Sequence, residues 1–361
     1  MSKRILLIPP SLNHRIVSDQ AIINSAAALL RSRGYRVYMV SWYRAGRVNI
    51  PSYVRIIWLP SPANIRPWIF RLVIRAFKQV VWLPTDTLDG LYNPTYIHSI
   101  AQAFYHAQHG RQLFCTGFSF RDMPDEKHHN PFHQLNSVFF AARDRISQQH
   151  FERYSGQKAH LCADIAYCLE SRPLPPALNT SLQALKARCR YVIAVNISSH
   201  YIRATGQSPQ TLAAALMPLL SENTGLVWIP SDFRGGSNSD PLCHQRILSC
   251  FSEQQRSQMM VIDDMLHPAV VKSLLGQVDS VLTGRMHLLI LALSEGTVPF
   301  AISYHDKFRI ELESWGLGEH LLSDGSQLST AISRFLANPT PAAAGRLADK
   351  QRLALTAYEG L

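Results

Sequence analysis

Hydrophobic and polar residues follow one another along the chain in segments that predict strands and helices in turn. Short apolar runs, typical of buried strands, occur at 4–8, 36–40, 54–59, 79–83, 112–116, 137–141 and 159–162. Segments with apolar residues at helical spacing lie between them, at 21–33, 97–107 and 146–154. Because strands that alternate with helices form parallel sheets with helical crossovers, this part of the chain is predicted to be an α/β domain.

A proline-rich break at residues 170–177 interrupts the pattern, which then restarts. Further strands are predicted at 191–195, 225–229, 259–262, 280–282 and 298–302, with helices at 211–220, 242–251 and 268–275. A length of 361 residues suits two domains of about 150 residues each. We therefore predict two Rossmann-like, doubly wound domains whose parallel sheets face a central cleft. They comprise residues 1–175 and 176–338, and a linker and helix follow at 339–361.

Composition narrows the class of protein and its partners. Hydrophobic residues make up 47% of the chain and charged residues 17%, which is typical of a globular protein. The six cysteines are scattered without a C-x-x-C motif, which predicts reduced thiols and a cytoplasmic location. The net charge of +11 predicts an acidic partner, which is a phosphorylated substrate, an anionic membrane surface or nucleic acid. Because no nucleic-acid-binding motif is present, we expect no nucleic-acid partner.

Residues 283–307 place charged side chains at the ends of two predicted strands. Arg285 and His287 follow the first strand, and Ser303, Tyr304 and Lys307 follow the second. Open α/β sheets bind ligands at the carboxyl ends of their strands, and a helix that starts there adds N–H groups suited to an anion. The segment therefore predicts a site for a small, multiply charged acid.

Six short segments carry more information together than any one of them does alone. They are Gly117-Phe118-Ser119-Phe120, Phe140-Ala141-Ala142-Arg143-Asp144-Arg145-Ile146-Ser147, Ala163-Asp164-Ile165-Ala166, Asn196-Ile197-Ser198, Gly284-Arg285-Met286-His287, and Ala301-Ile302-Ser303-Tyr304 with Lys307. In order and spacing they resemble the polysaccharide pyruvyl transferase family. The chain departs from that family's Asn-x-Gly-Asp-x-Ala start, where it has Val17-Ser18-Asp19-Gln20-Ala21, and it has Ser231-Asp232 where the family often has His-Asp.

The resemblance implies a GT-B-like fold and a transferase with phosphoenolpyruvate as donor substrate. We expect no cofactor and assign no metal ligands, and the sequence leaves any need for a divalent ion open. The pyruvyl group would form a ketal on a sugar of a cell-surface polysaccharide or of its lipid-linked precursor. The resemblance also assigns Arg143 to donor binding, and Lys307 and His287 to donor binding and catalysis. We add Arg285 because of its place beside His287.

The donor's chemistry accounts for these residue types. Phosphoenolpyruvate carries a carboxylate and a phosphate, and the planar fork of arginine can bind either one with two hydrogen bonds. Transfer requires a proton at the methylene carbon, and histidine is the usual general acid near neutral pH. We expect His287 to be that acid, with Arg143 beside it in the catalytic set.

Further residues are expected to hold the substrates. They are Asn196, Ser303 and Tyr304 along the strand ends, and Asp19 and Asp86, with Asp89, as candidates for binding sugar hydroxyls.

Each of these residues also has a purely structural interpretation. In that interpretation His287 is a buried core histidine, and Lys307 is a lysine exposed to solvent. Arg143 forms an ion pair with Asp144 at the start of the next helix, and Asp19 is the N-cap residue of the helix predicted at 21–33. The histidine-rich segment 128–133 is flanked by Pro124 and Pro131, with no downstream carboxylate at ligand spacing, which predicts a surface loop and no metal site.

Segment 66–78 is predicted to be a helix with two contrasting faces. Arg71, Arg75 and Lys78 share one face, while Ile69, Leu72, Val73 and Phe77 form another. Such a helix either lies on an anionic membrane, where a lipid-linked acceptor would be found, or packs on the sheet as an ordinary crossover helix. The first alternative would place the protein at the inner face of the membrane.

Two other functions remain open. The first is a GT-B glycosyltransferase that uses a nucleotide sugar. Retaining members of that class often carry two glutamates about seven residues apart near the helix that starts at Arg285, and Glu295 is the only carboxylate there. The second is a non-catalytic protein that retains the fold.

Overall fold

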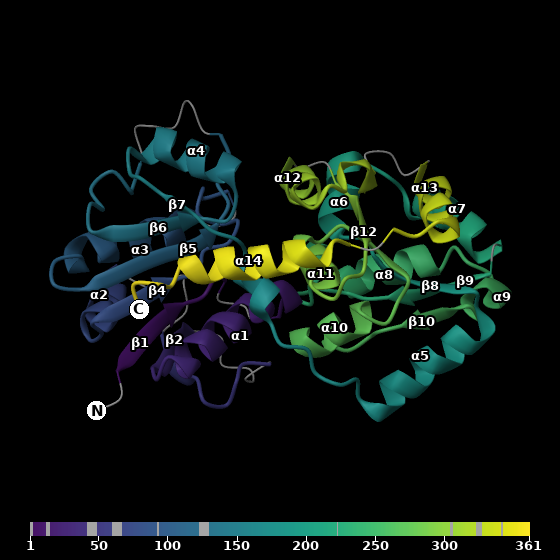
Figure 1. The fold of residues 1–361 in the computed structure, drawn as a ribbon, viewed down its shortest axis with the longest axis horizontal. Coiled ribbons are helices and arrows are strands. Elements are labelled where there is room, and N and C mark those ends of the chain that lie inside the picture. The colour runs from purple at the N-terminus through teal and green to yellow at the C-terminus, as the bar shows by residue number, and fades with distance from the viewer. Residues whose placement is uncertain are drawn as a thin grey trace. The chain divides into compact units, whose positions relative to one another are not determined.

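The computed structural model describes residues 3–11, 15–41, 49–59, 67–91, 94–122, 130–221, 223–303, 306–322, 327–340 and 342–361. The chain divides into two compact units (Figure 1). Unit 1 comprises Met1–His14, Asp19–Leu169 and Ala348–Leu361, and unit 2 comprises Arg15–Ser18 and Glu170–Leu347. The sequence placed the main boundary at residue 175, and the last residues of the chain return to unit 1.

Unit 1 is built around a parallel sheet in the order β3-β2-β1-β4-β5-β6-β7. Its strands are β1 (Arg4–Ile8), β2 (Arg36–Ser41), β3 (Arg55–Trp58), β4 (Gln79–Trp82), β5 (Gln112–Phe118), β6 (Val138–Ala142) and β7 (His160–Leu161). Its helices are α1 (Val17–Ser32), whose first two residues count with unit 2, α2 (Pro67–Arg75), α3 (Pro94–Ala107), α4 (Arg145–Ser155) and most of α14 (Ala344–Thr356). The order reverses direction between β1 and β4, which is the arrangement of a doubly wound sheet.

The central strands of unit 1 are apolar throughout because both faces of the sheet are covered. Residues 5–8 of β1 are all fully buried. Leu6 and Ile8 pack in one core with residues of α2, α3 and α4. Leu7 points to the opposite face, because successive side chains of a strand alternate. Continuous apolar runs of this kind are typical of parallel strands.

Unit 2 repeats the design with the order β10-β9-β8-β11-β12-β13. Its strands are β8 (Tyr191–Asn196), β9 (Thr224–Trp228), β10 (Met259–Val261), β11 (Ser280–Thr283), β12 (Pro299–Ile302) and β13 (Leu321–Leu322). Its helices are α5 (Pro176–Arg188), α6 (Ser199–Thr205), α7 (Pro209–Ser221), α8 (Asp240–Leu248), α9 (Glu253–Arg256), α10 (Pro268–Leu275), α11 (Met286–Leu293), α12 (Asp306–Trp315) and α13 (Leu328–Ala337). All strand pairs are parallel, as predicted.

The end of the chain is tied to unit 1 by side chains from three segments. The Tyr358 hydroxyl is buried and accepts a hydrogen bond from Thr116 Oγ1 at 3.3 Å. Gln351 donates to the backbone oxygen of Tyr167 at 3.0 Å, and Arg33 donates to the backbone oxygen of Tyr358. These contacts explain why residues 348–361 belong to unit 1.

Several helices differ from the sequence-based expectation, and α2 and α5 show why. The helix predicted at 66–78 ends at Arg75, and Leu72, which was placed on its apolar face, is 59% exposed. Phe70 and Ile74 are buried instead, and Phe70 packs against the ring of Tyr96 on α3 at 6.1 Å. Helix α5 was not predicted, because the prolines that mark the break also supply its first residue, Pro176, where the missing N–H costs nothing.

None of the described helices is both long and apolar enough to cross a membrane.

Candidate functional site

The site predicted in unit 2 lies at the point where its sheet reverses direction, between β8 and β11. Asn196 is the last residue of β8 and pairs with Thr283, the last residue of β11. Both are fully buried or nearly so. Because doubly wound sheets bind ligands where the strand order reverses, the carboxyl ends of these two strands form the candidate site.

The turn from β11 into α11 is tight and is fixed by hydrogen bonds to both strands. Gly284 donates its N–H to the backbone oxygen of Asn196 at 2.9 Å, and Thr283 Oγ1 accepts from the N–H of Arg285 at 3.0 Å. A Cβ atom on Gly284 would lie 3.0 Å from Ser198 Oγ and 3.2 Å from its backbone nitrogen. A side chain at position 284 would therefore crowd Ser198, which glycine avoids.

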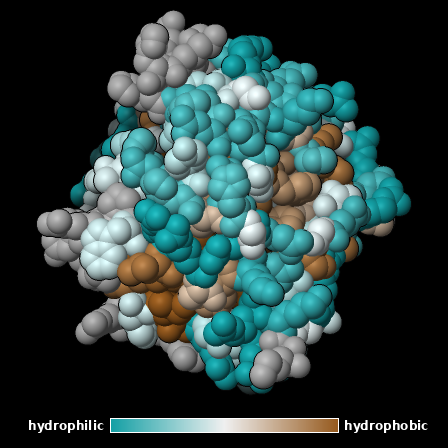
Figure 2. Space-filling view, turned by 90° about the vertical axis from the view of Figure 1, so that its left-hand side faces the viewer, coloured by the Kyte–Doolittle hydropathy of each residue, from teal (hydrophilic) through white to brown (hydrophobic). Residues whose placement is uncertain are grey.

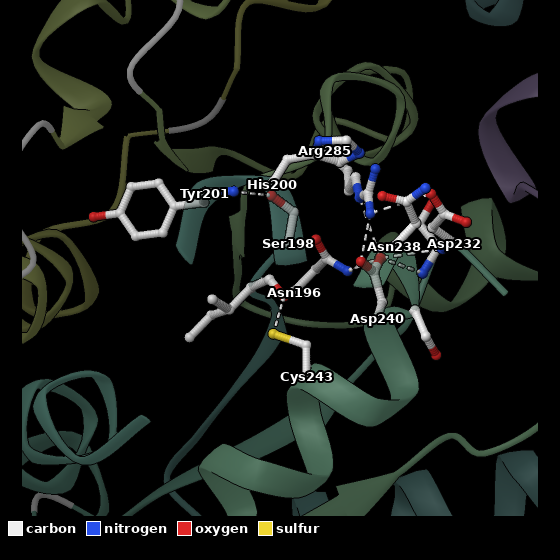
Figure 3. A network of polar contacts seen from close by, with 12 residues as sticks. Asn196, Ser198, His200, Tyr201, Asp232, Asn238, Asp240, Cys243 and Arg285 are labelled. Carbon is white, nitrogen blue, oxygen red and sulfur yellow. Dashed lines mark hydrogen bonds and ion pairs between the residues drawn. The ribbon is translucent and has the colours of Figure 1, made fainter. Parts of the chain in front are cut away.

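Arg285 makes a two-pronged ion pair with Asp240, the first residue of α8 (Figure 3). Its Nη2 donates to Oδ1 at 2.5 Å and its Nε donates to Oδ2 at 3.2 Å. Nη2 also lies 3.5 Å from Oδ2 of Asp232. The side chain of Arg285 is 15% exposed and both carboxylates are fully buried. The two carboxylates thus neutralise much of the charge that was expected to bind the donor.

Asp240 is the centre of this network, because three further groups donate to its Oδ2. They are Asn196 Nδ2 at 3.1 Å, and the backbone nitrogens of Ser231 at 3.0 Å and Asp232 at 3.1 Å. Burial raises the pKa of the Asp240 carboxyl, but the Arg285 charge and these hydrogen bonds outweigh it and hold the pKa below its ordinary value. In turn, burial lowers the pKa of Arg285, while Asp240 and Asp232 raise it above its ordinary value.

Other charged groups surround the pair. Arg234 donates to both oxygens of Asp232, from Nε at 3.0 Å and from Nη2 at 2.7 Å. His200, on α6, has Nδ1 2.9 Å from Nη2 of Arg203. Burial and the nearby Arg285 and Arg203 charges lower the pKa of His200 to about 4. His200 is therefore a neutral hydrogen-bonding group near pH 7.

The remaining residues predicted in unit 2 lie on the next elements. His287 is the second residue of α11 and is buried. Ser303 follows β12 directly and is also buried, and Lys307 is half-buried in the first turn of α12. Tyr304 lies outside the described residues. The structure thus places His287, Ser303 and Lys307 at the ends of the adjacent strands β11 and β12.

Arg143 lies in unit 1, directly after β6, and is part of a buried ion pair. Its Nη1 donates to Oδ2 of Asp164 at 3.1 Å and its Nε donates to Ser119 Oγ at 2.6 Å. The side chains of Arg143 and Asp164 are each 3% exposed. The neighbouring Asp144 instead caps α4, accepting from the backbone nitrogen and hydroxyl of Ser147 at 2.7 Å each. The structural alternative to a donor-binding role is thus an ion pair with Asp164 rather than with Asp144.

The carboxylates proposed for sugar binding have different surroundings within unit 1. Asp19 is buried in the first turn of α1, which starts at Val17, so it is not the N-cap residue. Asp86 is half-buried in the loop after β4, where the unit 1 sheet reverses, and it accepts from Thr85 Oγ1 at 3.3 Å. Asp89 pairs with Arg121 at 3.3 Å. The position of Asp86 is the one that fold topology favours for ligand binding.

Sequence reasoning missed Asp240, Arg234 and His200. The signal for Asp240 was present, because Ser239-Asp240-Pro241 is a strong helix start that follows β9. Its partnership with Arg285 spans 45 residues and could not be read from spacing.

In the part of the chain that the structure describes, no group of three or more His, Cys, Asp or Glu side chains is placed to hold a metal ion. The histidines at 128 and 129 lie outside that part.

Several solved structures share this fold. A putative UDP-N-acetylglucosamine 2-epimerase from Listeria monocytogenes is 12% identical with a TM-score of 0.61, over 98% of this chain and 92% of that one. A trehalose 6-phosphate synthase from Burkholderia multivorans is 13% identical with a TM-score of 0.56, over 99% and 95%. A glycosyltransferase from Rickettsia africae ESF-5 is 11% identical with a TM-score of 0.56, over the whole of both chains. The prediction of a GT-B-like fold is confirmed, and likeness at such low identity extends to the fold alone.

Comparisons of sequence gave one family. A family model described as polysaccharide pyruvyl transferase matches residues 19–306. The matched span includes Arg143, Asn196, Arg285 and His287 and ends one residue before Lys307. A search of curated protein sequences gave no significant match.

Proposed function

Because the chain belongs to the polysaccharide pyruvyl transferase family, we propose that it moves the pyruvyl group of phosphoenolpyruvate onto two hydroxyls of a sugar. The products are a ketal and inorganic phosphate. The acceptor is a sugar of a cell-surface polysaccharide or of its lipid-linked precursor. The family match over residues 19–306 is the observation that carries this proposal.

The proposed reaction begins with protonation of the donor's methylene carbon by His287. Carbon C2 then becomes electron-poor and is attacked by the oxygen of one sugar hydroxyl. The bond from C2 to the phosphate oxygen breaks, and a second hydroxyl attacks the same carbon to close the ketal. One hydroxyl proton restores the acid and the other leaves with phosphate, so that atoms and charges balance. A positioned general acid of this kind contributes about 10²- to 10⁴-fold to the rate.

Cations are proposed to hold the donor's carboxylate and phosphate. We assign this role to Lys307, which is half-buried at the end of β12, and to Arg143. Arg285 has a different proposed role, because two buried carboxylates, those of Asp240 and Asp232, lie against its guanidinium, whereas Arg143 pairs with the single carboxylate of Asp164. We propose that Arg285 and Asp240 together fix the turn that presents His287, while Asn196 and Ser303 lie beside it as substrate contacts, with Tyr304 following in the sequence.

Ligand-dependent thermal stability tests the donor assignment. A ligand at about 100 times its dissociation constant stabilises a protein by about 2.7 kcal/mol. We expect phosphoenolpyruvate to raise the unfolding temperature, and UDP and GDP to leave it unchanged. Stabilisation by UDP without phosphoenolpyruvate would instead support the nucleotide-sugar glycosyltransferase, and no response to any of them would favour a protein without this activity.

Variants separate binding from turnover. Lys307→Ala and Arg143→Lys are expected to weaken binding of phosphoenolpyruvate by about 10- to 100-fold, because each loses charge-assisted hydrogen bonds. His287→Asn should keep the stabilisation by phosphoenolpyruvate and lose release of phosphate in the presence of acceptor. Arg188→Ala, an exposed cation on α5, is the matched control and should change neither. Unchanged turnover in His287→Asn would exclude the proposed acid.

We propose a cytoplasmic location for this reaction. The support is chemical: all six cysteines are free thiols, and Cys115, Cys162, Cys189 and Cys243 are buried.

A further inference from the structure

The net positive charge of the chain comes from its first 85 residues. Residues 1–85 contain thirteen lysines and arginines but one carboxylate, Asp19, whereas residues 86–361 contain 23 lysines and arginines and 24 carboxylates. The first 85 residues therefore account for the whole net charge of +11. The stretch corresponds to β1–β4 with α1 and α2. A charge distribution this uneven along the chain points to an anionic partner for this stretch rather than to general solubility.

Helix α2 is unusual within this stretch because its outward side is not polar. Its nine residues are Pro-Trp-Ile-Phe-Arg-Leu-Val-Ile-Arg, which are apolar except for Arg71 and Arg75. Phe70 and Ile74 point into the core and hold the helix on the sheet. Trp68 and Leu72, one helical turn apart on the opposite side, are 56% and 59% exposed. An ordinary crossover helix would expose polar residues at these positions.

Basic and aromatic residues of α3 and of the loop after it continue this surface. Helix α3, which packs against α2, exposes Tyr105 and His106. Arg75 donates to the backbone oxygen of His106 at 3.4 Å, and Arg111 donates to that of Arg75 at 2.6 Å. Figure 2 views the chain from the side on which Figure 1 shows α2, and brown atoms gather in patches there among teal ones.

We propose that the outward side of α2, defined by Trp68, Arg71, Leu72 and Arg75, docks on an anionic phospholipid membrane. A short helix lying flat in the headgroup region inserts its apolar side chains at the acyl boundary, while arginines contact lipid phosphates. Tryptophan suits this depth because its ring is amphipathic. Since Phe70 and Ile74 fix α2 to the sheet, docking of the helix docks unit 1.

The exposed leucine distinguishes a membrane from other anionic partners. A nucleic acid or an acidic polysaccharide would be bound by the arginines, and Trp68 could stack on a base or a sugar ring. Leu72, at 59% exposure, has no role in either complex but gains free energy when it leaves water for lipid. The proposal concerns attachment only and does not depend on the reaction catalysed.

Sedimentation with vesicles tests the proposal on the whole chain. We expect binding to vesicles of phosphatidylcholine with about a quarter phosphatidylglycerol, weaker binding at high salt, and little binding to phosphatidylcholine alone. Arg71→Gln with Arg75→Gln should weaken binding by about 25-fold, on the basis of about fivefold for each arginine. Leu72→Glu should weaken it by about tenfold or more.

Matched controls come from unit 2. Leu242→Glu alters a leucine that is 47% exposed on α8, and Arg188→Gln with Arg190→Gln removes two exposed cations. Both should bind vesicles as the parent protein does, and circular dichroism should show every variant folded.

A second measurement follows Trp68 itself. Subtracting the emission spectrum of Trp68→Phe from that of the parent protein gives the emission of Trp68. The maximum of this difference spectrum should move to shorter wavelength when anionic vesicles are added, because the indole leaves water. Three results would overturn the proposal: no binding to anionic vesicles, equal loss in the α2 variants and the unit 2 controls, or binding that DNA or heparin abolishes while Leu72→Glu leaves it intact.

Discussion

The Arg285–Asp240 pair makes a quantitative prediction about unit 2. Asp240→Asn keeps the size of the side chain but removes the negative charge and turns N–H donors toward Arg285. Asp240 is fully buried and accepts from Arg285, Asn196 and two backbone nitrogens. Loss of one partner of a buried ion pair costs about 3–5 kcal/mol. We expect the lower end, about 3 kcal/mol, because Asp232 remains 3.5 Å from the guanidinium.

Thermal unfolding measures this cost. For a unit of this size, 1 kcal/mol lowers the midpoint by about 2–4 °C, so Asp240→Asn should lower the unit 2 transition by about 6–12 °C. The control is Asp349→Asn, which breaks a surface pair with Arg352 at 2.6 Å. Both partners of that pair are more than half exposed, so its loss should leave the midpoints of unit 1, in which it lies, and of unit 2 within error.

The pH dependence provides an independent check. Because the folded-state pKa of Asp240 lies below its ordinary value of 3.8, its stabilisation is complete above pH 3.8 and is lost as the pH falls through the folded-state pKa. The difference in unfolding midpoint between Asp240→Asn and the parent protein should therefore be full at neutral pH and become smaller only as the pH falls below 3.8. Equal midpoints for Asp240→Asn and Asp349→Asn at neutral pH would refute the reasoning.

Two further predictions concern the same unit. Burial lowers the pKa values of His200, His244 and His267 from 6.5 to about 4, so the unfolded chain binds more protons than the folded chain between those two pH values. The free energy of unfolding should therefore fall as the pH drops from 6.5 toward 4, which urea unfolding at a series of pH values would measure. A free energy of unfolding that stays constant over this range would show that the histidines are solvated. Gly284→Ala places a Cβ atom 3.0 Å from Ser198 Oγ and should cost about 1–3 kcal/mol by overpacking. The control Gly345→Ala, with open space around its Cβ position at the start of α14, should leave the same denaturation midpoint unchanged or raise it slightly, because alanine favours the helix.

Helix α2 shows how far periodicity alone can lead. The sequence predicted the helix correctly, yet it placed Leu72 with Val73 and Phe77 on the buried face. The rotation of the helix about its axis was decided by Phe70, which packs against Tyr96 on α3. The sequence of a helix that is apolar on most sides does not specify which side is buried. Packing against the neighbouring helix determines it.

What the sequence determined by itself was the alternation of elements and the ends of the strands. Short apolar runs that alternate with helical segments predict parallel strands, and the residues after such strands lie at the carboxyl edge of the sheet, so Asn196, Arg285 and Ser303 were placed correctly at strand ends. What only the tertiary structure decided was which of these side chains meet. The pairing of Arg285 with Asp240 and of Arg143 with Asp164, and the return of residues 348–361 to unit 1, join segments far apart in the chain. The local pattern of hydrophobic and polar residues does not predict such contacts, because they depend on how whole strands and helices pack.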